Sequence, residues 1–170
     1  DVLTASLMLA ERLDQPVVVE ATSNQVNQDG GYTGLRPSDF IAFVYGLADA
    51  AGVARGRIIF GGDHLGPQAW RKGSAEAAMA KARVMVAEYV RAGFTKIHLD
   101  CSEGCAGEPA QLGDVVAAAR AADLAAAALA AAPDPAALIF VIGTEVPPPG
   151  GARADEHGDI AATTPASAAA

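Results

Sequence analysis

The chain contains the run Arg57-Ile58-Ile59-Phe60-Gly61-Gly62, which leads directly into Asp63 and His64. Two later apolar runs also end on an acid: residues 96–99 before Asp100, and residues 138–144 before Glu145. Apolar runs of this kind are typical of strands buried on both faces, as in a parallel sheet. The carboxyl ends of parallel strands meet at one rim, where α/β enzymes place their chemistry. The pattern therefore predicts an α/β fold with a site at the strand ends.

Strands and helices alternate along the rest of the chain. We expect strands at 16–20, 57–61, 95–99 and 138–142. We expect helices at 1–13, 37–51, 74–91 and 110–132. Successive strands start about 40 residues apart with one helix between them, which indicates repeated βα units and parallel strands. Right-handed crossovers follow from that arrangement.

The two ends of the chain fit part of a (β/α)8 barrel of the TIM type. Asp1 lies inside a helical pattern with no strand before it, and residues 164–168 have the pattern of a helix start. About four strands with their helices amount to half of such a barrel. We therefore expect residues 1–170 to form one partial barrel domain that is truncated at both ends.

Composition excludes several functional classes. The net charge of −8 and the pI near 4.7, with few adjacent basic residues, argue against a nucleic-acid or membrane partner. No run reaches the roughly 18 apolar residues of a membrane span, and no signal peptide is visible, so we expect a cytoplasmic protein. Cys101 and Cys105 lack a second Cys or His pair downstream, which favours reduced thiols over a structural zinc site.

The residues after the second strand are the best candidates for chemistry. Asp63 can accept a proton, and His64 can bind a metal. The alternative is a turn in which Asp63 caps a helix and His64 is only hydrogen-bonded. Asp100 at the end of the third strand is also expected to be functional. His98 shares its strand face, and we interpret it as a buried histidine that is hydrogen-bonded to a neighbour.

Two further segments contribute candidates. Glu145 can act as a metal ligand, an orienting group or a general acid/base, or it can form an ordinary ion pair. The long segment 147–163 after it resembles a lid. The loop after the first strand carries Asn24, Gln25 and Asn27, whose amides can bind polyols or phosphate oxygens. Any polar turn has a similar composition, so this signal is weak alone.

Taken together, these motifs resemble the tagatose-1,6-bisphosphate aldolase Z-type subunits over nearly the whole chain. The matching segments are 20–28, 30–34, 61–67, 96–100, 105–107 and 143–147. Members of that family are accessory, nominally non-catalytic partners of an aldolase in galactitol and N-acetylgalactosamine breakdown. They are much longer than this chain and are similar to the zinc-dependent class II aldolases, which are (β/α)8 barrels.

The resemblance implies roles for individual residues. Asp63 takes the place of a proton-transferring Asp, and His64 that of a ligand to a divalent metal, with zinc the first choice. Glu145 is expected near the metal, and further histidine ligands would come from later strands. We expect catalytic roles for Asp63, Asp100 and Glu145. Substrate contacts are expected from Asn24, Gln25 and Asn27.

Two functions from different classes are consistent with this resemblance. The first is an accessory subunit that supports a catalytic aldolase subunit acting on a phosphorylated ketohexose. The alternative is a metal-dependent ketohexose-phosphate 4-epimerase acting on tagatose or fructose 6-phosphate, since some relatives of these subunits have that activity. Aldol cleavage and 4-epimerisation share the polarised C2 ketone, the base at the C4 hydroxyl and the broken C3–C4 bond. A homo-oligomer is compatible with either function.

Overall fold

The computed structural model describes residues 2–143. In this part of the chain, four parallel strands form one sheet in the order β1-β2-β3-β4. The strands are β1 (Val17–Thr22), β2 (Ile58–Leu65), β3 (Lys96–Leu99) and β4 (Ile139–Ile142). The helices are α1 (Val2–Leu13), α2 (Pro37–Ala50), α3 (Ala75–Ala92) and α4 (Asp114–Ala131), with 3₁₀ turns η1 (Arg55–Arg57), η2 (Pro67–Trp70) and η3 (Pro135–Ala137). The predicted α/β fold, with parallel strands as in part of a barrel, is confirmed.

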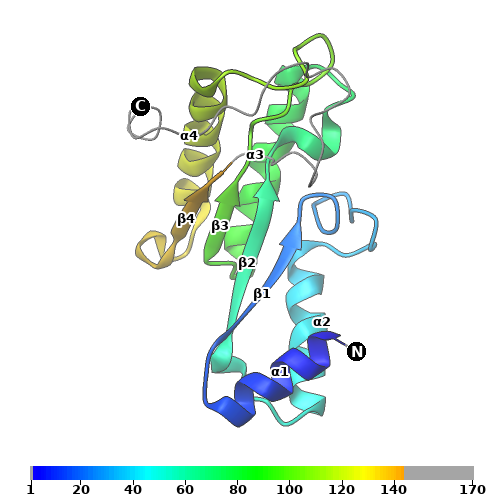
Figure 1. Cartoon of the computed structure of the whole chain (residues 1–170), viewed down its shortest axis with the longest axis vertical. Coiled ribbons are helices and arrows are strands. Elements are labelled where there is room, and N and C mark those ends of the chain that lie inside the picture. Colours follow the sequence, from blue (N-terminus) through cyan, green and yellow to red (C-terminus); the bar gives the residue numbers. More distant parts are fainter. Residues whose placement is uncertain (1, 144–170) are drawn as a thin grey trace, which may run out of the picture.

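Helices α3 and α4 pack behind the sheet, and α2 lies beside them against the β1–β2 side (Figure 1). Aromatic rings fill the space under this face, where Phe60 of β2 contacts Phe94, and Phe94 contacts Tyr89 of α3 with the two rings tilted by 49°. All three rings are almost completely buried. Burial of rings of this size is the main stabilising contribution of such a core.

The opposite face of the sheet differs from the expectation of strands buried on both sides. Val18 is 51% exposed, and Ile59 and Val141 are each 37% exposed. Alternation along the strands places these side chains on the face away from the helices. Within residues 2–143 this face therefore stays open, and the polar residues of the candidate site lie on it.

Helix α3 begins and ends where the sequence predicts. The Ser74 hydroxyl accepts a hydrogen bond from the Ala77 amide at 3.3 Å, which satisfies one of the free N–H groups of the first turn. Gly93 ends the helix with φ of 114°, a left-handed conformation that favours glycine. These two residues set the length of the helix that carries Tyr89 towards the sheet.

We expect Ser74→Ala to lower the free energy of unfolding by about 1 kcal/mol, because the capping hydrogen bond is lost. Urea unfolding of the complete protein, followed by circular dichroism, measures the change. Ser38→Ala is the matched control, since Ser38 lies inside the first turn of α2 rather than at its cap. An equal loss of stability in the two variants would contradict the capping role.

Two predicted boundaries were wrong. Helix α4 begins at Asp114 rather than at residue 110, because the preceding residues pair with the loop after β3. The Gly104 amide donates to the Ala110 carbonyl, and the Leu112 amide donates to the Ser102 carbonyl. Strand β2 continues to Leu65, beyond the expected end at residue 61.

None of the helices described in residues 2–143 is long and apolar enough to cross a membrane.

Candidate functional site

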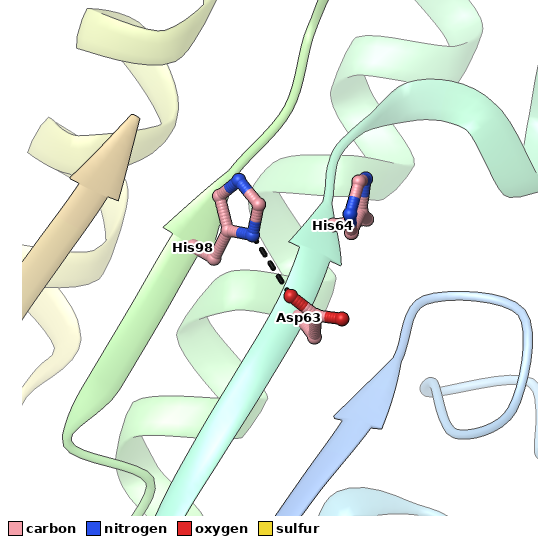
Figure 2. Close-up of side chains that lie close together, drawn as sticks. All are labelled: Asp63, His64 and His98. Carbon is pink, nitrogen blue, oxygen red and sulfur yellow. Dashed lines mark hydrogen bonds and ion pairs between the residues drawn. The ribbon is translucent and has the colours of Figure 1, made fainter. Parts of the chain in front are cut away.

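An irregularity at the end of β2 places two consecutive side chains in one site. In a regular strand Asp63 and His64 would point to opposite faces. The pairing of β2 with β3 shifts register between Gly62 and Leu65, and His64 adopts a positive φ of 48°. That conformation is uncommon for a residue other than glycine and marks local strain. As a result both side chains lie close to His98 of β3 (Figure 2).

Asp63 and His98 form a direct hydrogen bond between neighbouring strands. The distance from His98 Nδ1 to Asp63 Oδ1 is 2.8 Å, and the imidazole N–H donates to the carboxylate (Figure 2). The other ring nitrogen of His98, Nε2, is buried and has no hydrogen-bond partner among residues 2–143. A Cβ added at Gly143 would lie 2.6 Å from this Nε2, so the glycine provides the space that the ring occupies.

Asp100 orients His64 from the end of β3. Its Oδ2 lies 2.9 Å from His64 Nδ1, and its Oδ1 accepts hydrogen bonds from the Ser102 amide and hydroxyl at 2.9 and 2.7 Å. Ser23, which is completely buried, donates its hydroxyl to the His64 carbonyl at 3.1 Å. Both the ring and the strained backbone of His64 are therefore held by neighbouring segments.

On the same face of the sheet, a charged pair lies level with Gly61, two residues before Asp63 along β2. Glu20, Gly61 and Lys96 are aligned across three strands, and Lys96 Nζ lies 2.5 Å from Glu20 Oε1. The absence of a side chain at Gly61 lets this ion pair span β2, since a Cβ there would lie 2.4 Å from Glu20 Oε1. Lys96 Nζ is also 3.8 Å from Asp63 Oδ1.

These contacts determine the charge on Asp63. Burial raises the pKa of Asp63, but the hydrogen bond from His98 and the nearby His64 and Lys96 outweigh it. The net result is a pKa below the ordinary value of an aspartate. Asp63 is therefore a carboxylate near neutral pH, which is the form that accepts a proton or binds a cation.

Three side chains have the composition of a metal site. Asp63, His64 and His98 each offer one ligand atom, and these atoms lie within 4.8 Å of one another. Two imidazoles with one carboxylate are typical of catalytic zinc sites, which leave a further position for substrate. The residues present therefore fit a divalent metal.

The amide side chains of the loop after β1 differ in what they contact: two bond within the loop, and one faces outward. Asn27 is 4% exposed, and its amide donates to the Ser23 carbonyl and accepts from the Asp29 and Gly31 amides, so it holds the loop together. Gln25 accepts from the Thr22 amide within the same loop. Asn24 is exposed and reaches towards Gln68 after β2. Of the three predicted substrate contacts, Asn24 is the one that faces outward at the strand ends.

The structure brings together Asp63, His64 and Asp100, as the positions after successive strands led us to expect. Glu145 and the segment 147–163, which was expected to resemble a lid and contains His157, lie outside the described residues. Sequence reasoning gave His98 only a structural interpretation and did not single out Ser23 or Ser102. For His98 the available signal was its position two residues before Asp100, on the side of the strand that faces Asp63.

Cys101 follows Asp100 directly in the sequence, and both cysteines of the chain are buried. Burial raises the pKa of Cys101 to about 12, with a further increase from Asp100. Burial and then Glu108 raise the pKa of Cys105. Raising the pKa of a thiol lowers the fraction of reactive thiolate near neutral pH and makes the thiol a poorer nucleophile.

We expect both thiols to resist iodoacetamide in the folded protein at neutral pH, because the reactive thiolate is scarce and shielded. Mass spectrometry of the peptide that carries Cys101 and Cys105 measures the modification. The same protein in concentrated urea is the control and should be alkylated at both positions. Alkylation of the folded protein at the rate seen in urea would contradict the burial of these thiols.

Comparison with known proteins identifies the family. The family model described as D-tagatose-1,6-bisphosphate aldolase subunit GatZ/KbaZ-like matches residues 1–170. D-tagatose-1,6-bisphosphate aldolase subunit GatZ of Escherichia coli strain K12 is 55% identical over 152 residues, and that of Shigella boydii serotype 18 is 54% identical. Each alignment covers 88% of this chain and 36% of the relative, so the chain spans about a third of the relatives' length.

A solved structure agrees with this assignment. The protein described as a probable tagatose 6 phosphate kinase from Sinorhizobium meliloti 1021 superposes with a TM-score of 0.81 at 53% sequence identity. The superposition covers 85% of this chain and 36% of that protein. The resemblance read from the motifs is confirmed, and the chain belongs to the D-tagatose-1,6-bisphosphate aldolase subunit GatZ/KbaZ-like family.

Proposed function

We propose that the complete protein is the accessory, non-catalytic subunit of a class II tagatose-1,6-bisphosphate aldolase in galactitol and N-acetylgalactosamine catabolism. The observation that carries this proposal is the 55% identity to relatives named as subunits of that aldolase. Its partners are then a catalytic aldolase subunit and a phosphorylated ketohexose, and it acts in the cytoplasm. Residues 1–170 contribute one partial (β/α) barrel domain to it.

Co-expression tests the accessory role. The catalytic tagatose-bisphosphate aldolase subunit of the same genome is purified with and without the complete protein, and the half-life of its aldolase activity is measured. We expect a longer half-life with the complete protein, since binding to the folded catalytic subunit stabilises it. His64→Ala should support the catalytic subunit equally well. An unchanged half-life, together with no co-purification, would overturn the accessory role.

A second candidate is a metal-dependent 4-epimerase of tagatose or fructose 6-phosphate. The observation that favours it is the grouping of Asp63, His64 and His98 at the strand ends. When bound there, a divalent metal such as zinc supplies polarisation of the sugar's C2 ketone. An accessory role alone does not explain why His64 has a strained backbone and lies close to Asp63 and His98.

The residues of the chain supply the remaining steps. Asp63, a carboxylate with a lowered pKa, accepts the proton of the C4 hydroxyl while the C3–C4 bond breaks. Return of that proton as the bond re-forms on the other face inverts C4. Asp100 keeps the His64 ring in place, and Asn24, Gln25 and Asn27 form or shape the sugar side of the site. Glu145 is proposed as a further acid, base or ligand.

The two candidates differ in what the protein does without its partner. The complete protein, purified alone and loaded with zinc, is incubated with tagatose 6-phosphate, and formation of fructose 6-phosphate is followed. Turnover that is lost in Asp63→Asn would establish the epimerase. No turnover of either sugar phosphate by the metal-loaded protein would remove the epimerase and leave the accessory role.

A further inference from the structure

A hollow of about 340 Å³ lies between the loop that follows β1 and the segment that follows β2. It is lined by Asn24 from the loop after β1, by Gln68 and Ala69 of η2, and by Arg71 and Lys72. Its size falls within the range of small-molecule sites, about 300–1,000 Å³. None of the chemistry described above uses Arg71 or Lys72.

The hollow is a local exception in a strongly acidic chain. The sequence has a net charge of −8, yet its Arg71-Lys72 pair lies here. Glu103 faces one of the two cations, with its Oε2 at 2.7 Å from Arg71 Nη1. Lys72 forms no ion pair with another residue in the range 2–143. The balance of these three side chains is therefore one positive charge, which favours an anionic ligand.

The donors around the hollow are held in place. Glu103 Oε2 accepts from both Gln68 Nε2 and Arg71 Nη1, each at 2.7 Å. Gln68 Oε1 in turn lies 3.4 Å from Asn24 Nδ2. A guanidinium has five N–H donors, so Arg71 keeps donors for a ligand after bonding to Glu103. Arginine held in this way is well suited to phosphate oxygens, and lysine adds a mobile point charge.

Gln68 connects this hollow with the metal group. The same side chain lines a narrow crevice with His64, Pro67, Asp100 and Glu103. The crevice is small, about 10 Å³, but through Gln68 it joins the surroundings of Arg71 and Lys72 to those of His64. A ketohexose phosphate has a phosphate at one end and a carbonyl and hydroxyls along the chain.

We propose that the hollow formed by Asn24, Gln68, Arg71 and Lys72 is the phosphate subsite for a phosphorylated ketose whose sugar carbons lie at Asp63, His64 and His98. This inference rests on the proposed function for the identity of the ligand as a ketohexose phosphate. It goes beyond that function by assigning phosphate recognition to Arg71 and Lys72, which face the solvent after η2.

Calorimetric titration of the complete protein with tagatose 6-phosphate, tagatose and inorganic phosphate tests the assignment. We expect tagatose 6-phosphate to bind more tightly than either of the other two ligands. Lys72→Gln and Arg71→Gln should each weaken its binding by about tenfold, the effect of one charge-assisted contact. Binding of tagatose should not change, because its hydroxyls and carbonyl lie away from these cations.

Arg83→Gln is the matched control, because it removes one positive charge that is paired with Asp123 on the outer helices. The inference is overturned if Lys72→Gln and Arg71→Gln bind tagatose 6-phosphate like the wild type, or if Arg83→Gln weakens binding as much as they do. It is also overturned if inorganic phosphate binds as tightly as the ester. Failure of the accessory role would be detected in a different experiment, as an unchanged half-life of the aldolase activity of the catalytic subunit.

Discussion

His64→Ala and His98→Ala variants of the complete protein are each expected to lose the divalent metal, with zinc affinity lowered by more than about 100-fold. The two imidazoles and the Asp63 carboxylate form the group of potential ligands in residues 2–143. Loss of a direct ligand costs more than loss of an orienting group, which typically lowers affinity by about 10–100-fold. Competition with a chromophoric chelator measures the affinity, and elemental analysis after dialysis measures the retained zinc.

The third histidine of the chain provides the matched control. His157→Ala removes the same imidazole from a segment that the sequence predicts to be a loop, and it should retain zinc. Asp63→Asn should also retain the metal, because the amide oxygen can still coordinate, but it should lose any turnover, because the amide does not accept the proton. Wild-type zinc content in both His64→Ala and His98→Ala would remove the metal assignment altogether.

Gly66→Ala is expected to destabilise the protein by about 3 kcal/mol and to disturb the site, although the substitution adds only a methyl group. A Cβ on Gly66 would lie 1.8 Å from the Asp100 carbonyl oxygen, which no side-chain rotation relieves. The backbone after β2 must therefore move away from the end of β3. That movement opposes the hydrogen bond from the Asp100 amide to the Leu65 carbonyl, now 3.0 Å long. Because Asp100 orients His64, zinc affinity should fall together with stability.

Gly56→Ala is the control for this substitution, because nothing lies within 4 Å of a Cβ at that position. Urea unfolding and the zinc competition assay are applied to both variants. We expect Gly56→Ala to stay within about 0.5 kcal/mol of the wild type, as do most substitutions without new contacts. A Gly66→Ala protein with wild-type stability and zinc affinity would show that the two strand ends need not approach so closely.

Some residues of the candidate site could be identified from the sequence, and others could not. Asp63, His64 and Asp100 were found because each lies at a strand end, and parallel strands end at a common edge. His98 was interpreted as a buried histidine hydrogen-bonded to a neighbour, and it does bond to Asp63. No local pattern reveals that its other ring nitrogen has no hydrogen-bond partner among residues 2–143. Asn27 was expected at a substrate, but its amide is used by three backbone groups of its own loop.

The sequence by itself determined the order and type of the elements, the parallel sheet and the family, because hydrophobic periodicity, caps and contiguous motifs are local properties of the chain. Only the tertiary structure decided how the site is assembled. The register shift that turns His64 towards Asp63 arises from the pairing of β2 with β3. The approach of Gly66 to Asp100 and of Gly143 to His98 likewise joins residues far apart in sequence. Such contacts depend on ångström-scale packing between strands, which the one-dimensional pattern of residue types does not encode.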